Sequence, residues 1–510
     1  MDLSTAVNAV VATLRRRPAD LLPFYLLGTA VVVIARVPFL IGAAAAVAYL
    51  HVTGRLAAAA DALAELDLQP PDQAPVEEDP EAMEAWFEWV ESLLPALEPL
   101  YSEVAIGLVA IGTVAAAVVS LLAYAAVSAG QMNAVFARLR DERGLVAGIG
   151  GVRRHWLSFL GIYLAEFVLW VGVIGLSALV IGLAVAVGGP LVGALVALVV
   201  ILLAFVVLVA VRVIFAFAPA ALVVEDAGVA GALRGSGGFI RSNPADAAAY
   251  LVVAVGVLFG ISSAASALTV VGAGTIVALF SAVVVAPALD LLKTVLYGDS
   301  RNAVAPPSRP EASLRTQLAA GWDRTKRETV DFVRGTVGLH VAATAVLVGF
   351  FAVGWVAVEP LIGVIDTSIE ARLADHIAPV AALEFFGNNW SVAIGMSFAG
   401  VALIVPTLTA LAFNGVALGA IAALEENLAT LVAFVVPHGI LEIPALIVAG
   451  ALGFHLGLAA WGTFRGSVSR EAFADRLEAA FWVTMGVGAL LFVAALIEGF
   501  ISPYYWRLFL

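Results

Sequence analysis

The chain has 510 residues, of which 62% are hydrophobic and 13% charged, and its formal net charge at pH 7 is −13. This composition excludes a water-soluble globule, because too few polar side chains are present to cover its surface, and it indicates a protein embedded in lipid. The absence of cysteine excludes disulfides, thiolate metal sites and cysteine nucleophiles. Lysine is scarce and Asp and Glu are abundant, which is a haloarchaeal-type acidic composition. High salt screens the repulsion among such surface carboxylates, which stay hydrated.

Long apolar runs follow one another along the chain, and each is long enough for a helix to cross the hydrocarbon core of a bilayer. We therefore predict an all-α fold, a polytopic transmembrane helical bundle of about 11 spans with interfacial amphipathic helices. The predicted spans are 21–50, 104–134, 157–185, 190–222, 245–267, 270–292, 336–357, 391–411, 414–434, 439–462 and 480–501.

Basic and acidic residues lie in different connecting segments. Segments that hold 21 of the 26 basic residues should be cytoplasmic, and they are 15–17, 138–154, 234–241, 293–334 and 465–476. Segment 55–103 carries 13 carboxylates and 358–389 carries five, so we expect both outside. The chain is then a multi-pass protein of the cell membrane with a cytoplasmic N-terminus and an uncleaved first span. Residues 21–54 are long enough for one or two passes, and one pass preserves this charge bias.

A polar stretch with three prolines at 298–312 is the predicted domain linker. We expect an N-terminal six-span membrane domain at 1–300, with the external acidic insertion 55–103, and a C-terminal five-span domain at 312–510. Segments that mix arginine with spaced apolar residues should lie flat at the interface; they are 138–156, 226–243, 312–335 and 466–480. The amphipathic segment 82–97 either covers the bundle or docks an external partner.

Asparagine, glycine, proline, histidine and glutamate recur in a distinctive order in the second half. In chain order they are Asn388, Asn389, Asn414, Gly415, Gly419, Pro437, His438, Gly439, Glu442, Pro444, Gly453 and Gly457. Their Asn-Gly and Pro-His-Gly-x-x-Glu patterns resemble the stage II sporulation protein M family of integral membrane proteins over about residues 312–510. In endospore formers, members of that family anchor a peptidoglycan-remodelling complex. The resemblance therefore implies a membrane scaffold.

The first half is similar to membrane domains attached to glycerophosphodiester phosphodiesterases of archaea and bacteria. The matching residues are 212–219, 225–228, Ser236 and 241–243. No phosphodiesterase domain accompanies them in the sequence, which lacks the Glu and His metal ligands of such an enzyme.

Pro437 and Gly439 predict a kinked or re-entrant piece at 430–440, because proline removes a backbone donor and glycine permits close backbone approach. His438 and Glu442 lie one helical turn apart, where their side chains can share a hydrogen bond. The pair has three interpretations: a packing motif, a proton or ion relay, or a notch for a partner. One His–Glu pair supplies too few ligands for a structural metal site, so no metal or cofactor is predicted.

Among the ionisable residues within predicted spans of the first half are Glu166, Arg212 and Asp290. Arg212 opposite either carboxylate would form an internal ion pair and avoid an uncompensated charge in hydrocarbon. The Gly-x-x-x-Gly patterns at 415–419 and 453–457 indicate close helix packing.

The sequence contains no phosphate-binding loop, nucleophile elbow or zinc-protease motif, and nothing in it indicates nucleic-acid binding. We therefore predict a non-enzymatic integral membrane scaffold, for assembly or membrane remodelling. Its expected partners are the lipid bilayer and other membrane or envelope proteins. The alternative is a transporter or permease subunit that uses intramembrane Glu, His and Arg residues along a polar pathway.

Overall fold

The computed structural model describes residues 1–64, 66, 80–269, 274–363, 367–373, 376–505 and 507. Within these residues the chain is helical, apart from turns, short connections and an isolated bridge between Thr367 and Glu425. The all-α prediction is therefore confirmed for the described part of the chain. Residues 65 and 67–79 of the predicted acidic insertion lie outside it.

The first half of the chain folds into helices α1 to α10, with a π-helical turn at Ser281–Val285 between the last two. Their bounds are α1 Leu3–Arg16, α2 Pro23–Val52, α3 Arg55–Ala64, α4 Pro80–Leu97, α5 Glu103–Arg138, α6 Gly144–Val224, α7 Val229–Ser242, α8 Pro244–Thr269, α9 Gly274–Phe280 and α10 Ala286–Asp299.

The second half follows an extended connection after α10 and forms helices α11 to α18. Their bounds are α11 Leu314–Gly335, α12 Val337–Ala357, α13 Ile369–Arg372, α14 Ala378–Ala399, α15 Val405–Leu424, α16 Leu428–Phe464, α17 Arg470–Phe500 and α18 Ser502–Tyr505. N-cap side chains accept hydrogen bonds from the first turns of α1, α11, α16 and α17; they are Asp2, Ser313, Asn427 and Ser469.

Nine helices in the described residues are long and apolar enough to cross a membrane. One of them is α6, which reverses direction at Gly189, where φ is 75°. Glycine adopts this left-handed conformation without steric cost, and Pro190 then restarts the helix. The predicted spans 157–185 and 190–222 are thus the two arms of one hairpin. The protein is a helical membrane protein, as predicted, and the total of about 11 passes stays a prediction.

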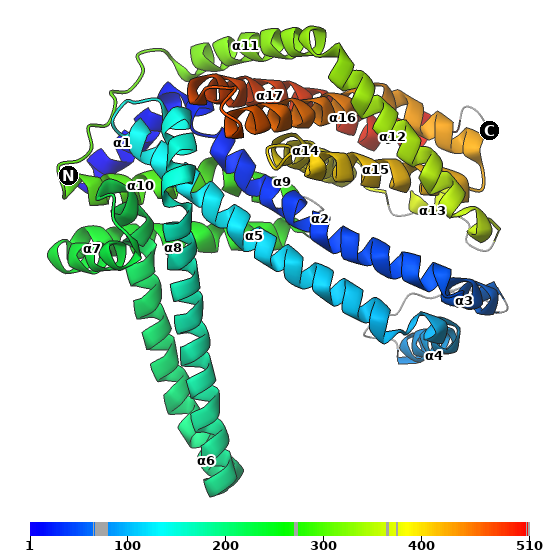
Figure 1. Ribbon diagram of the computed structural model, residues 1–510, viewed down its shortest axis with the longest axis horizontal. Helices are drawn as coiled ribbons and strands as arrows, with labels where there is room; N and C mark the ends of the chain where they lie inside the picture. Colours follow the sequence, from blue (N-terminus) through cyan, green and yellow to red (C-terminus); the bar gives the residue numbers. More distant parts are fainter. Residues whose placement is uncertain are drawn as a thin grey trace.

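The α6 hairpin projects from the body at a steep angle to α2 and α5 (Figure 1). None of its most apolar stretch is buried within the protein. The apolar part of each arm is roughly 45 Å long, which exceeds the roughly 30 Å of a hydrocarbon core. An arm immersed over that whole length would therefore have to tilt strongly in the bilayer.

Charged segments gather at opposite ends of the body. Helices α1 and α7 and the start of α11 lie at one end, which we call the arginine-rich end, and α3, α4 and α13 lie at the other, the acidic end (Figure 1). This segregation agrees with the predicted sidedness of the loops. Which end faces the cytoplasm stays a prediction.

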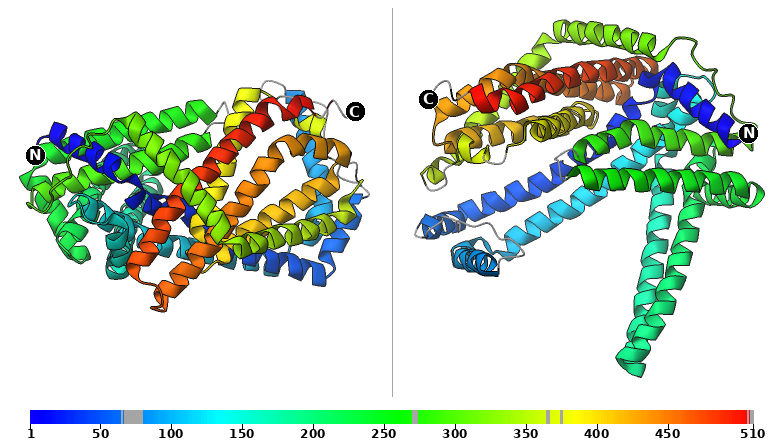
Figure 2. Two further views of the ribbon diagram at one scale, coloured as in Figure 1. Left: turned by 90° about the horizontal axis from the view of Figure 1, so that it is seen from above. Right: turned by 180° about the vertical axis from the view of Figure 1, so that it is seen from behind.

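The two halves of the chain pack side by side, with α2 and α9 next to α14 (Figure 2). A Cβ atom on Gly395 of α14 would lie 2.7 Å from Val33 of α2, and one on Gly387 would lie 3.2 Å from Ile276 of α9. Glycine therefore allows close approach at this interface.

Several predicted boundaries were wrong. Segments 138–156 and 466–480 are not separate flat helices, because α6 starts at Gly144 and α17 at Arg470 and each continues into its apolar part. Segments 226–243 and 312–335 do form separate amphipathic helices, α7 and α11.

The predicted spans 391–411 and 414–434 are displaced by about ten residues from α14 and α15 (about three turns of helix). The chain turns between these helices at Leu403 and Ile404, which have φ of 64° and 72°. Apolar side chains hide this turn from a hydropathy profile.

Candidate functional site

A polar cluster forms where α14, α16 and α17 meet inside the second half. It consists of Asn389, His438, Glu442, Glu498 and Ser502. Helix α16 places His438 and Glu442 one turn apart on one face, and α17 brings Glu498 opposite them. One ligand atom from each of these three side chains lies within 4.8 Å of the other two.

The His438 side chain is only 5% exposed and is fixed from two directions. Its Nδ1 lies 2.9 Å from Ser502 Oγ, and Phe434 packs edge-on against its ring. Its Nε2 points between the two carboxylates, 3.9 Å from Glu498 Oε1 and 4.0 Å from Glu442 Oε2. The expected hydrogen bond between His438 and Glu442 was therefore wrong, because both distances are too long for one.

The two carboxylates have few polar partners. Asn389 Nδ2 donates a hydrogen bond of 2.9 Å to Glu442 Oε1. Glu498 Oε2 is buried and accepts no hydrogen bond from the described residues. Among the described residues, His438 is the ion-pair partner of both carboxylates. No arginine or lysine of these residues lies within ion-pair distance of Glu442 or Glu498. Two carboxylates that face each other within a bilayer repel each other, and a proton or a cation between them would offset this repulsion.

Residues 342–503 match the family model of stage II sporulation protein M. The C-terminal half thus carries a stage II sporulation protein M domain, as its motifs predicted. The match extends from within α12 to the start of α18 and includes all five residues of the polar cluster. A search of the curated proteins and a search of the solved structures found no match to the chain. The resemblance of the first half to phosphodiesterase-associated domains stays a prediction.

Glycines of the stage II sporulation protein M domain lie at backbone contacts between its helices. A Cβ on Gly415 would lie 2.6 Å from Leu347 O and one on Gly419 2.0 Å from Phe351 O, both in α12. A Cβ on Gly457 would lie 2.6 Å from Gly400 O, where α14 ends. Gly453 likewise approaches Met396 O of α14.

Other motif residues of the domain act locally. Helix α16 continues through Pro437 and Pro444, so the re-entrant alternative for 430–440 was wrong, and a kink at Pro437 stays a prediction. A Cβ on Gly439 would meet only side chains of α16 itself. Asn414 Nδ2 donates to Ala410 O one turn earlier, and Asn388 Nδ2 donates to Asn389 Oδ1.

Sequence reasoning missed two members of the polar cluster, Glu498 and Ser502. Glu498 lies near the end of a predicted span, where snorkelling accounts for a charge without assigning a function. Only the antiparallel packing of α16 and α17 reveals that it faces His438.

Glu166 and Asp290, the two carboxylates considered as partners of Arg212, belong to two separate ion pairs. Arg212 Nη1 lies 3.1 Å from Glu166 Oε1 across the α6 hairpin. Asp290 instead lies 2.7 Å from Lys293 Nζ and accepts a hydrogen bond from the Tyr25 hydroxyl. Each carboxylate thus has its own partner.

A second polar site, which we call the junction, joins the two halves at the arginine-rich end. Arg143 of the first half lies with its Nη2 2.9 Å from Asp475 Oδ1 and 3.4 Å from Glu478 Oε2, both of α17. Within the second half, Arg324 Nη1 of α11 lies 2.9 Å from Glu478 Oε1. The hydrogen bond to Asp475 raises the pKa of Arg143, so this guanidinium stays charged at physiological pH. A pocket of about 540 Å³ lies beside the junction, lined in part by Arg15, Asp20 and Trp482.

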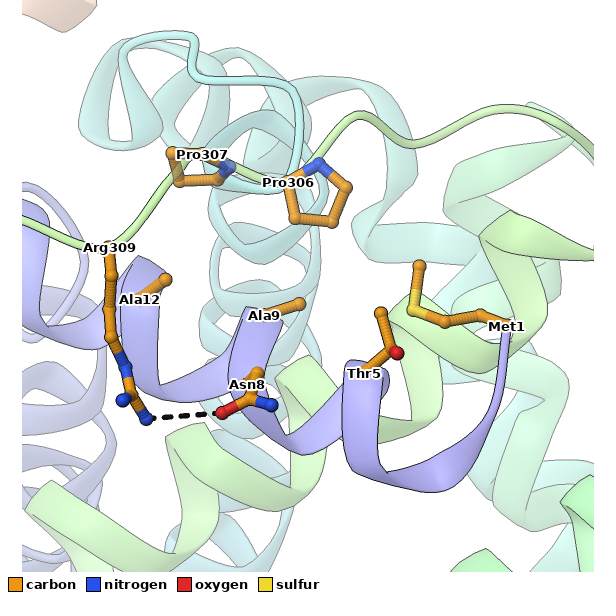
Figure 3. Close-up of a pocket in the computed structure, with 8 residues that line it drawn as sticks. All are labelled: Met1, Thr5, Asn8, Ala9, Ala12, Pro306, Pro307 and Arg309. Carbon is orange, nitrogen blue, oxygen red and sulfur yellow. Dashed lines mark hydrogen bonds between the residues drawn. The ribbon is translucent and has the colours of Figure 1, made fainter.

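The connection between the halves crosses helix α1. Pro306, Pro307 and Arg309 line a shallow pocket of about 480 Å³ with Asn8 and Ala12 (Figure 3). Arg309 Nη2 donates a hydrogen bond of 3.1 Å to Asn8 Oδ1. The predicted linker is thus held against the body in this region.

Proposed function

We propose that the protein is a non-enzymatic integral membrane scaffold, whose partners are the lipid bilayer and other membrane or envelope proteins. The observation that carries the proposal is backbone-to-backbone packing within the stage II sporulation protein M domain. Such packing favours a body with one fixed arrangement of helices.

Three glycines lie where a side chain would overlap the backbone of a neighbouring helix or turn. A Cβ added to Gly400 would lie 1.9 Å from Gly453 O, and one added to Gly354 would lie 2.1 Å from Val416 O. At Gly419 the corresponding distance is 2.0 Å to Phe351 O. These contacts join α12 to α15 and the end of α14 to α16. If one helix of either pair slid along the other by one residue, a side chain would enter these positions, and so the contacts resist relative movement within each pair.

The junction supports the same proposal for the whole chain. Arg143 contacts Asp20 of the first half and Asp475 and Glu478 of the second. A network of several charges holds its geometry better than one exposed pair does. The proposed domains 1–300 and 312–510 would then behave as one unit.

Partners would meet the scaffold at its exposed surfaces. The α6 hairpin offers apolar side chains along both arms, and α4 exposes Phe87, Val90 and Leu94 at the acidic end. In a membrane the first surface contacts lipid or the spans of other proteins, and the second contacts the headgroup zone.

The polar cluster is the observation that favours the alternative, a transporter or permease subunit. A transporter alternates between arrangements in which opposite ends of the body open, whereas a scaffold keeps one arrangement. Distances between spin labels distinguish the two, and the cysteine-free chain allows labels at chosen positions.

The experiment uses two exposed pairs across the halves, His51 with Glu426 at the acidic end and Ala245 with Glu471 at the arginine-rich end. Each pair is replaced by cysteine and spin-labelled in liposomes. A scaffold gives one narrow distance distribution for each pair. A transporter would instead give two populations of label-to-label distance for each pair. Under an imposed proton or sodium gradient, the longer distance would gain population at one end of the body and lose it at the other.

A further inference from the structure

We infer that His438, Glu442 and Glu498 bind one divalent transition-metal ion, with zinc as the best fit, inside the stage II sporulation protein M domain. The inference goes beyond the proposed scaffold role and does not depend on it. It rests on the charge balance of the cluster, the orientation of the imidazole and the spacing of the ligand atoms.

The two carboxylates of the cluster lack a basic partner other than His438 among the described residues. Glu442 and Glu498 both face the imidazole of His438, which carries no charge unless it is protonated. No arginine or lysine among the described residues faces them. Glu498 is 13% exposed, and its Oε2 is buried without a hydrogen-bond partner in that part of the chain. An unpaired buried acceptor is costly, and a cation between the carboxylates would satisfy it while cancelling their repulsion.

The imidazole is oriented as a metal ligand. When Nδ1 carries the proton and donates it to Ser502 Oγ, 2.9 Å away, Nε2 presents its lone pair between the carboxylates. Metal-bound histidines characteristically donate the other ring N–H to a neighbouring acceptor, which sets the tautomer and ring orientation. Asn389 supplies the comparable contact to Glu442 through its 2.9 Å hydrogen bond.

The spacing requires only a small contraction. The Nε2-to-carboxylate distances are 3.9 Å and 4.0 Å. Zinc bonds of about 2.1 Å in tetrahedral geometry place ligand atoms about 3.4 Å apart. Rotation of the two glutamate side chains can supply the difference without moving a helix. Three protein ligands leave one coordination position, which water can fill.

The donor set selects the class of ion. One imidazole nitrogen with two carboxylates suits zinc, manganese or iron, whereas magnesium and calcium prefer all-oxygen sites with more ligands. Zinc fits best because it accepts four ligands with no preference for octahedral geometry. The bound ion would tie α16 to α17 close to the end of α17.

The test measures zinc on the full-length chain purified in detergent. After treatment with a chelator and dialysis, the protein is incubated with zinc or magnesium, and its bound metal and unfolding temperature are determined. We expect one zinc per chain and a rise in unfolding temperature of roughly 3–6 °C at a hundredfold excess over the dissociation constant. Magnesium at the same concentration should leave the unfolding temperature unchanged.

The diagnostic variant is Glu498→Gln, which keeps the shape of the side chain and removes one charge. Without metal it should unfold at the same temperature as the wild type or higher, because carboxylate repulsion is gone. With zinc it should show no stabilisation, and Glu442→Gln should behave alike. The matched control Glu471→Gln changes an exposed carboxylate at the opposite end of α17 and should keep the full zinc response.

Two results would overturn the inference. If the carboxylates share a proton in place of an ion, zinc will not shift the unfolding temperature of the wild type, although Glu498→Gln is still stabilised. If zinc stabilises both variants as strongly as the wild type, the ion binds elsewhere. Neither result bears on the spin-label distances that test the scaffold, so the two proposals can fail separately.

Discussion

Asp20 caps helix α6 across 124 residues of sequence, since its Oδ2 accepts a hydrogen bond of 2.8 Å from the Gly144 amide. Its Oδ1 accepts a second bond from the next amide, Leu145 N, at 3.1 Å. Behind this carboxylate lies Arg138, whose side chain is fully buried and whose Nη1 is 3.8 Å from Asp20 Oδ2. One carboxylate thus caps a helix and balances a buried charge.

Replacing Asp20 should therefore lower the unfolding free energy strongly. Asp20→Ala leaves both amides without the cap and Arg138 without its buried counter-charge, and we expect a loss of about 3–5 kcal/mol in unfolding free energy. Thermal unfolding in detergent measures it. Asp141 also pairs with Arg138, at 3.6 Å, but its side chain is 38% exposed. Asp141→Asn should accordingly cost about 0–1 kcal/mol, and equal losses for the two variants would contradict the assigned role of Asp20.

Glycine contacts between α12 and α15 allow a matched comparison within one helix pair. Gly419→Ala puts a methyl group 2.0 Å from Phe351 O, and we expect a loss of about 1–3 kcal/mol as the helices separate. Gly349 in α12 has no heavy atom within 4 Å of its Cβ position. Gly349→Ala should therefore be neutral or stabilising, by about 0.5–1 kcal/mol. Circular dichroism melts of both variants check this, and a neutral Gly419→Ala would refute the close packing.

The predicted sidedness of the membrane can be read by chemical labelling of single cysteines. Ser300, beyond α10 at the arginine-rich end, should be cytoplasmic, and exposed Glu88 of α4 should be outside. An impermeant maleimide applied to intact cells should label Glu88→Cys and spare Ser300→Cys until the cells are lysed. If the reagent labels Ser300→Cys on intact cells and spares Glu88→Cys, the orientation in the membrane is the opposite of the predicted one.

Hydropathy located most membrane helices because lipid-facing residues carry the signal. The predicted spans 21–50 and 104–134 match α2 and α5 within a few residues. The turn at Leu403 and Ile404 was missed because its residues are apolar and the turn depends on a tertiary contact, the approach of Gly400 to Gly453 O. Pro437 did not break α16, since neighbouring groups in a membrane helix can accommodate a proline.

The candidate site shows the same division between local and distant information. The spacing of His438 and Glu442 placed both on one helical face, as expected from a period of 3.6 residues. Their actual polar partners come from elsewhere: Ser502 is 64 residues after His438, and Asn389 is 53 residues before Glu442. One sequence contains no signal for such pairings, because they depend on which helices pack together.

The serine beside His438 offers a test of the inferred zinc site that leaves all three ligands intact. Ser502→Ala removes the oxygen 2.9 Å from His438 Nδ1, and we expect zinc affinity to fall by about 10–100-fold. Titration with a competing zinc indicator measures the affinity. Ser397 is a buried serine outside the cluster that donates to Ala449 O. Ser397→Ala should leave zinc affinity unchanged, and an equal drop in both variants would indicate a general loss of packing.

Substitutions of Glu442 separate a packing role from proton relay. In metal-free protein, Glu442→Gln keeps an oxygen that accepts from Asn389 Nδ2, whereas Glu442→Leu leaves that donor unpaired. An unpaired buried donor costs about 1–3 kcal/mol, so we expect Glu442→Leu to unfold at a clearly lower temperature than Glu442→Gln. Thermal stability in detergent decides the question. Equal stability of Glu442→Leu and the wild type would rule out the packing role. Proton-driven uptake into liposomes that Glu442→Gln abolishes without unfolding the protein would assign the residue to transport, because glutamine cannot ionise.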